Sequence, residues 1–230
     1  MFREAVAGMG EACKAFDTPV TGGNVSFYNE SPDSAVYPTP VIGMVGLIED
    51  ISHMTPAYFQ HEGDLIYLIG ETKPEIGGSE FLKEHYGLVT GDCPSINLEL
   101  EKKTQKAVLQ AIRNGWIKSA HDLADGGLAI ALAECCIINE DNPIGASIQL
   151  TQNNLLPEYL LFSESQSRFL LSTTPQFKDQ LENHFHSQSI EVSFLGKTGG
   201  NVLRINGWID LQLKTLLHAY YQPIPKAMNL

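Results

Sequence analysis

The residues best suited to chemistry form one decapeptide, TGGNVSFYNE, at positions 21–30. Its glycine pair, Gly22 and Gly23, lets the backbone approach a phosphate closely, because no Cβ intervenes and a positive φ costs little. Polar side chains follow in near alternation with apolar ones: Asn24, Ser26, Tyr28, Asn29 and Glu30. Neutral oxygen donors with one carboxylate suit a metal–nucleotide and a polar substrate. The alternative is an ordinary turn, since most glycine pairs beside an asparagine form one.

A second motif, HDLADGG, occupies positions 121–127. Asp122 and Asp125 are three residues apart, so in a turn or a first helical turn they face the same side. Such a pair ahead of two glycines is able to hold Mg²⁺, while the following helix N-terminus receives a phosphate. The alternative is that one aspartate only caps the helix predicted at 127–137. His121 is more often structural than catalytic in such a setting.

The third motif is FSESQSR at positions 162–168. It contains a carboxylate, a hydroxyl, an amide and a guanidinium, from Glu164, Ser165, Gln166 and Arg168. This mixed set of donors and acceptors suits a ribose hydroxyl, an amide or a phosphate. The equally weighted alternative is a solvated turn that leads into a strand.

Composition and the remaining motifs exclude several classes of protein. Lys plus Arg total 15 against 27 Asp plus Glu, so the formal charge of −12 disfavours nucleic acid and anionic membranes. The sequence has no P-loop and no nucleophile elbow, and His184 and His186 are two residues apart, which places them on different helix faces. The cysteines form no CxxC and are expected to be reduced and mostly buried. Without a recognisable signal peptide or a membrane-length apolar run, we expect a cytoplasmic protein.

The elements that position these motifs alternate between helix and strand without regular βαβ spacing, which predicts the α+β class. An apolar stripe predicts a helix from Phe2 to Phe16, and a helix so close to the start favours further sequence upstream. Ser95 is expected to cap a helix that continues through Ile112, and the tail 208–221 is expected to be helical up to the prolines 223 and 225. A further helix is predicted at 175–186, and strands at 41–48, 65–70, 147–150, 169–172, 190–195 and 201–205.

Five segments together resemble one enzyme family. GGNVSFYNE, GDLIYLIG, IGGSEFL, HDLADGGLAIALAE and FSESQSRFLL stand in the order and spacing of phosphoribosylformylglycinamidine synthase, the large synthetase subunit. The resemblance is to the C-terminal part of that enzyme and runs from Phe2 to about Asn206. More distantly, the chain is similar to aminoimidazole ribonucleotide synthetase, selenophosphate synthetase and thiamine-monophosphate kinase.

The resemblance implies the C-terminal portion of an A-type ATP-binding domain at 1–60 and a B-type domain with a mixed sheet at 61–230. It also implies an ATP- and Mg²⁺-dependent carbon–nitrogen ligase of purine biosynthesis. This ligase converts formylglycinamide ribonucleotide to the amidine with ammonia from a glutaminase subunit or domain. Gly23 would contact ATP, Asn24 would bind Mg²⁺ and Ser26 would touch substrate. An auxiliary nucleotide site would include Asp122, Asp125, Glu164, Ser165 and Gln166.

The resemblance places no catalytic residue in this chain, because the family's catalytic histidines lie in a first half that is absent here. We therefore expect no turnover from the chain alone. Two alternatives are a non-catalytic nucleotide-binding or assembly module and a related small-molecule kinase or synthetase. An incomplete A-type sheet should expose the apolar segment 41–48, which predicts a homo-oligomer.

Overall fold

A computed structural model of the chain describes all residues except 1, 25–29, 31, 36–38, 152–153 and 229–230. The chain divides into two compact units, Met1–Glu49 and Asp50–Leu230. Ser26 lies outside the described residues, as do Tyr28 and Asn29. Each unit is described by itself below.

The first unit consists of one helix and extended chain. Helix α1 spans Phe2–Phe16, which confirms the helix predicted from the apolar stripe. None of its residues is buried, and Phe2 and Val6 are 53% and 47% exposed. A single isolated bridge joins Glu30 to Ala35 in the described part of this unit.

The strand predicted at 41–48 is wrong. This segment has no regular secondary structure, and Val41 and Val45 are 92% and 99% exposed. Its β-branched composition favours an extended conformation, but a strand also needs a neighbour that accepts its backbone hydrogen bonds and covers its side chains. The described residues of the first unit provide no such neighbour.

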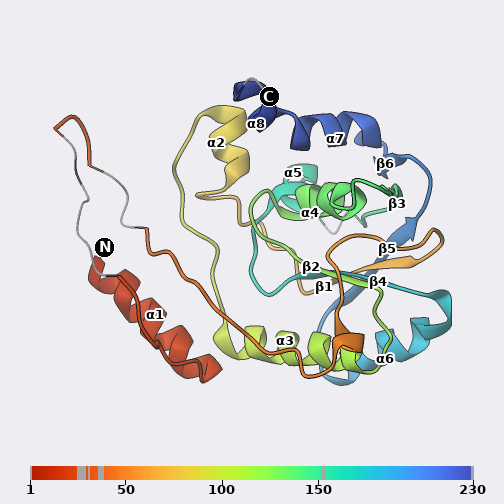
Figure 1. The fold of residues 1–230 in the computed structure, drawn as a ribbon, viewed down its shortest axis with the longest axis horizontal. Helices are drawn as coiled ribbons and strands as arrows, with labels where there is room; N and C mark the ends of the chain where they lie inside the picture. Colours follow the sequence, from red (N-terminus) through yellow and green to blue (C-terminus); the bar gives the residue numbers. More distant parts are fainter. Residues whose placement is uncertain (1, 25–29, 31, 36–38, 152–153, 229–230) are drawn as a thin grey trace. The chain divides into compact units, whose positions relative to one another are not determined.

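The second unit is built on a seven-stranded mixed sheet, which confirms the α+β class (Figure 1). The strand order is β2-β4-β1-β5-β3-β6-β7, and every neighbouring pair is antiparallel except the parallel pair β3 and β6. The strands are β1 (Leu65–Ile69), β2 (Ser119–Asp122), β3 (Ala146–Ile148), β4 (Phe169–Thr173), β5 (Val192–Thr198), β6 (Val202–Ile205) and β7 (Ile209–Gln212).

Helices cover both faces of this sheet. In Figure 1, α3 and α6 lie on one side of it, and α4 and α5 lie on the other. The α-helices are α2 (Glu80–Tyr86), α3 (Leu98–Arg113), α4 (Gly127–Ile137), α5 (Pro157–Phe162), α6 (Lys178–Ser187), α7 (Leu213–Tyr221) and α8 (Pro223–Ala227). Two short 3₁₀ helices, η1 and η2, span Ile51–His53 and Pro175–Phe177. No helix in the described part of the chain is long and apolar enough to cross a membrane.

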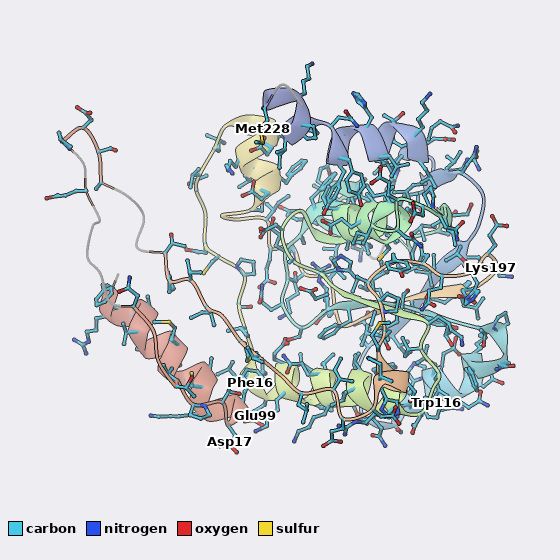
Figure 2. All side chains as sticks on the ribbon, viewed as in Figure 1. Phe16, Asp17, Glu99, Trp116, Lys197 and Met228 are labelled. Carbon is cyan, nitrogen blue, oxygen red and sulfur yellow. The ribbon has the colours of Figure 1, made fainter. Side chains whose placement is uncertain are left out.

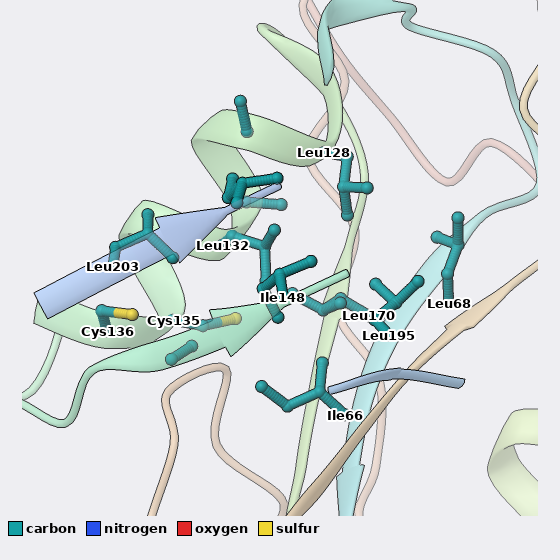
Figure 3. Packing of buried hydrophobic residues seen from close by; sticks show 14 of the residues in the cluster. Ile66, Leu68, Leu128, Leu132, Cys135, Cys136, Ile148, Leu170, Leu195 and Leu203 are labelled. Carbon is teal, nitrogen blue, oxygen red and sulfur yellow. The ribbon is translucent and has the colours of Figure 1, made fainter. Parts of the chain in front are cut away.

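Strand β1 shows why the sheet has two cores. All five of its residues are buried, and successive side chains point to opposite faces. Ile66 and Leu68 join the larger cluster, which includes the residues of α4 drawn in Figure 3. Leu65, Tyr67 and Ile69 join the second cluster, with residues of α3 and α6. Trp116, labelled in Figure 2 just after α3, packs against this second cluster.

The larger cluster contains two of the four free cysteines. Cys135 and Cys136 on α4 are both buried, while Cys13 is partly exposed and Cys93 is exposed. Burial raises the pKa of the Cys136 thiol to about 12 and raises that of Cys135 well above its ordinary value. These two thiols therefore stay protonated and serve as small apolar side chains (Figure 3).

Several predicted boundaries are corrected. Asn97, and not Ser95, caps α3, because its side chain accepts from the amides of Glu99 and Leu100 at 3.1 Å each. The Ser95 hydroxyl instead donates to the Glu75 carboxylate at 2.6 Å. In the tail, β7 pairs with β6 before α7 begins. Helix α7 ends at Tyr221 as predicted, and Pro223 then begins the further short helix α8, since proline is tolerated in a first helical turn.

Asp64, the residue just before β1, has a buried carboxylate, and one of its oxygens lacks a hydrogen-bond partner among the described residues. The residue is 3% exposed, and the oxygen concerned is Oδ2. The imidazole of His61 lies 3.6 Å from that oxygen and is itself largely exposed. Burial raises the pKa of Asp64, and the charges of His61 and Lys118 oppose this rise only in part.

Asp64→Asn is expected to stabilise the protein at pH 8 by about 1 kcal/mol, because it removes a buried and poorly compensated charge. The pKa of Asp64 is higher in the folded state than in the unfolded state, where it is about 4. The stability of the wild type therefore falls as the pH rises from about 4 through the folded-state pKa. The advantage of the variant should therefore shrink as the pH is lowered toward 4. Urea unfolding of both proteins at pH 4 and pH 8 checks this, and an equal difference at the two values would contradict it.

Candidate functional site

The glycine loop of the first unit is open. Gly23 and Asn24 are exposed and lie outside helices and strands. A Cβ added at Gly22 or Gly23 would meet nothing within 4 Å in the described structure. The fold of this unit therefore does not itself require glycine at these positions, and the loop is accessible to a ligand.

The two aspartates of the second motif lie at the surface just ahead of α4. Asp122 is the last residue of β2, Asp125 stands in the following turn, and both are exposed. The capping alternative is wrong, because the N-cap of α4 is Gly126, in the left-handed conformation and without a side-chain cap. His121 has a structural setting: its Nε2 lies 3.1 Å from Oε2 of Glu134, and its side chain is only 14% exposed. In the described part of the chain, no three His, Cys, Asp or Glu side chains group as metal ligands do.

Glu164 ties two glycine-containing segments together. Its Oε1 accepts from the amide of Glu80 at 2.9 Å and from the amide of Gly126 at 2.8 Å. Glu80 begins α2 and Gly126 caps α4, so one carboxylate oxygen satisfies a free amide at the start of each helix. A negative charge there is also favourable for both helix dipoles.

The serines of the third motif bind the chain that leaves β1. The Ser165 hydroxyl accepts from the amide of Lys73 at 3.1 Å, and the Ser163 hydroxyl donates to the Lys73 carbonyl at 2.7 Å. Both serines are fully buried. The interpretation of this segment as a solvated turn is therefore wrong. Only Gln166 is exposed, with its amide donating to the Glu164 carbonyl at 3.1 Å.

Arg168 lies at the centre of this cluster and is 2% exposed. Its guanidinium donates to the Ser165 carbonyl at 2.9 Å, to the Thr72 hydroxyl at 3.1 Å and to the Ser163 carbonyl. Burial lowers its pKa to about 10, while the negative charges of Glu75 and Glu164 act in the opposite direction. The side chain thus stays charged at neutral pH and joins segment 72–75 to segment 163–168.

The sequence motifs do not indicate the partners of this cluster. Thr72 and Lys73 stand more than 90 residues from Ser165 and Arg168, which they contact, in a segment without a motif of its own. The glycine pair of the second motif does indicate one of the close contacts. A Cβ on Gly127 would lie 2.4 Å from the Ser163 carbonyl, so the GG pair allows α4 to approach the third motif closely.

Segment 70–77 has a pocket on each side of Pro74. One pocket, of about 400 Å³, is lined by Gly70–Pro74 together with residues of β1, β5 and α4. The other, of about 530 Å³, is lined by Pro74–Gly77, Leu82, Gly91–Cys93 and Ser95. The cluster around Arg168 therefore holds the wall that the two pockets share.

Glu164→Ala is expected to lower the free energy of unfolding by about 1–3 kcal/mol, because two helix-start amides lose their acceptor. Glu164→Gln should cost less, since its amide oxygen is still able to accept both bonds. Chemical denaturation of the two variants measures the difference. If neither variant loses stability, the Glu164 side chain is not what holds α2 and α4.

Comparison with known proteins identifies a family and several relatives of this chain. Residues 61–205 match the family model described as AIR synthase related protein, C-terminal domain, and residues 1–48 match the corresponding N-terminal domain. The chain is 46% identical to the phosphoribosylformylglycinamidine synthase subunit PurL of Moorella thermoacetica over 99% of its own length. It is 47% identical to PurL of Alkaliphilus metalliredigens over 90% of its length. It spans 31% and 28% of these two relatives.

Solved structures share the fold at lower sequence identity. T. maritima PurL complexed with FGAR and the same protein complexed with ATP have TM-scores of 0.62 and 0.57, at 19% identity. Each covers 73% of this chain, which in turn covers 30% and 28% of those chains. The resemblance drawn from five sequence motifs is thereby confirmed. The chain belongs to the AIR synthase related protein family.

Proposed function

We propose that this chain is the C-terminal portion of an ATP-dependent carbon–nitrogen ligase of purine biosynthesis. In this reaction ATP phosphorylates the amide oxygen of formylglycinamide ribonucleotide, and ammonia then displaces phosphate to form formylglycinamidine ribonucleotide and ADP. The observation that carries the proposal is the 46% identity to Moorella PurL over 99% of this chain. The ATP and FGAR bound in the T. maritima PurL structures agree with these substrates.

In this proposal residues 1–60 are part of an A-type ATP-binding domain, and residues 61–230 form a B-type domain. Gly23 contacts ATP, Asn24 binds Mg²⁺ and Ser26 contacts the substrate. The exposure of Gly23 and Asn24 supports a ligand-facing role. An amide oxygen ligates Mg²⁺ without adding negative charge next to a polyphosphate, and the ion, when bound, neutralises charge that develops during phosphoryl transfer.

The auxiliary nucleotide site divides into two kinds of residue. Asp122, Asp125 and Gln166 are exposed, and the two carboxylates have the oxygen donors that Mg²⁺ prefers. Glu164 and Ser165 already bind backbone amides of the chain itself. We therefore propose that the first three contact a nucleotide, whereas Glu164 and Ser165 position the loops around it.

The proposed reaction needs ammonia from a glutaminase partner and active-site residues that this chain does not contain. The structure of a PurLQS assembly from Thermotoga maritima supports a multi-subunit arrangement. We further propose a cytoplasmic location and self-association through the exposed apolar segment 41–48, which light scattering over a range of concentrations tests.

The isolated chain is expected to show no ATP-dependent amidine formation. Product analysis with formylglycinamide ribonucleotide, ATP, Mg²⁺ and ammonia checks this, and steady turnover would contradict the proposed division of the enzyme. Calorimetry with Mg-ADP addresses the alternative of a nucleotide-binding assembly module. Tight binding by the chain alone, together with failure to restore activity to the rest of a related enzyme, would favour that alternative.

A further inference from the structure

The 400 Å³ pocket beside segment 70–74 has an apolar floor. Leu68 of β1, Leu128 of α4 and Leu195 of β5 line it and are 7%, 1% and 4% exposed. Its volume lies in the range of small-molecule sites, which combine apolar walls with a few polar groups. None of the predicted site residues that the structure describes lines this pocket.

Two carboxylates, those of Glu71 and Glu191, line the pocket. Ile69 pairs with Val192, and the amide of Gly70 donates to the Glu191 carbonyl at 2.9 Å. This register brings Glu71, just after β1, and Glu191, just before β5, to neighbouring positions. Gly70 has a φ of +91°, and a Cβ there would lie 2.4 Å from the Ser167 carbonyl, so the turn that places Glu71 depends on glycine.

Glu71 and Glu191 are both exposed residues, and their carboxylates lie close enough to repel each other. Burial and then the charge of Glu71 raise the pKa of Glu191. Neither carboxylate has a hydrogen bond or an ion pair with a described residue. Lys73 also lines the pocket, and its positive charge lowers the pKa of Glu75.

We propose that this pocket binds a small organic cation, with its ammonium or guanidinium group between Glu71 and Glu191 and its apolar stem on Leu68, Leu128 and Leu195. Phe194, which lines the same pocket and is 48% exposed, adds an aromatic face for the cation. Asp122, Asp125 and Gln166 do not line this pocket, so it is distinct from the proposed auxiliary nucleotide site.

Titration of the whole chain with n-hexylamine, followed by amide chemical shifts, tests the site. Hexylamine should shift the signals of Gly70, Ser193 and Phe194, and hexanol, its neutral counterpart, should bind more weakly. The double variant Glu71→Gln/Glu191→Gln should bind hexylamine about fivefold more weakly, as expected for the loss of two partly exposed charge pairs. Glu140→Gln, which changes one charge outside the pocket, should bind as the wild type does.

Three results would overturn the proposal. The first is the absence of shifts at Gly70, Ser193 and Phe194 up to the solubility limit of the amine. The second is equal affinity for hexylamine and hexanol, which would indicate an apolar pocket without selection for charge. The third is unchanged amine affinity in the double variant, with thermal unfolding used to confirm that it is folded.

Discussion

Arg168→Met is expected to lower the free energy of unfolding by about 3–5 kcal/mol, the cost of removing one partner from a buried set of charges. The guanidinium is 2% exposed and donates to Ser163, Ser165 and Thr72. Without the guanidinium, the carbonyls of Ser163 and Ser165 each lose a hydrogen-bond donor. The nearby carboxylates of Glu75 and Glu164 also lose the positive charge that compensates them. Methionine preserves most of the volume, so the loss reports the polar contacts and not a cavity.

Arg204→Met is the matched control. Arg204 on β6 is 57% exposed and forms one ion pair with Asp210, at 3.1 Å. Exposed pairs of this kind contribute about 0–1 kcal/mol, so this variant should unfold almost as the wild type does. Urea titrations of the three proteins give the comparison. Equal stability of the two variants would show that Arg168 does not hold segments 72–75 and 163–168 together.

Asn24→Ala is expected to reduce ligase activity by about a hundredfold or more, because metal affinity falls steeply when a ligand or even its hydrogen-bonded support is lost. This effect requires an otherwise complete enzyme. A suitable one is Moorella PurL with the matching 31% of its length replaced by this chain, to which that part is 46% identical. Activity is measured as product formed per enzyme at rising Mg²⁺ concentrations.

A loss that high Mg²⁺ partly restores would support metal binding by Asn24, since weaker affinity is overcome by mass action. Asn114→Ala is the control, because Asn114 is an exposed residue at the end of α3 and lies outside every proposed site. It should leave activity unchanged. An Asn24→Ala chimera as active as its parent would remove Asn24 from the proposed site.

The sequence predicts the second unit far better than the first. LIYLI at 65–69 and VIGMVGLI at 41–48 are both apolar runs typical of buried strands, yet only the former is a strand. The difference lies in their neighbours: β1 lies between β4 and β5, whereas the described residues around 41–48 offer no partner strand. Local composition gives both segments a preference for the extended conformation, but only pairing with neighbouring strands makes one of them a strand.

Short elements were also difficult to predict. Helices α2 and α5 have seven and six residues, too few for a repeated apolar stripe. Strand β7 has four residues and takes its extended conformation from β6, with which it pairs. Their positions depend on contacts distant in sequence, which no local pattern contains.

The motifs predict which residues belong to the candidate site, but they do not predict what each residue contacts. Glu164 was expected to face a nucleotide, and its carboxylate instead accepts amides 84 and 38 residues away. We therefore assign Glu164 a positioning role at the starts of α2 and α4, and not contact with the nucleotide. Asp122 and Asp125 are not caps, which leaves both carboxylates accessible at the surface.

The most direct test of the central claim is the activity of the Moorella PurL chimera that carries this chain. The account predicts ATP-dependent formation of formylglycinamidine ribonucleotide from formylglycinamide ribonucleotide and ammonia, by a chimera that elutes and unfolds like its parent. The isolated chain in the same assay should form none. A folded chimera without activity, beside an active Moorella parent, would contradict the assignment of this chain to the ligase.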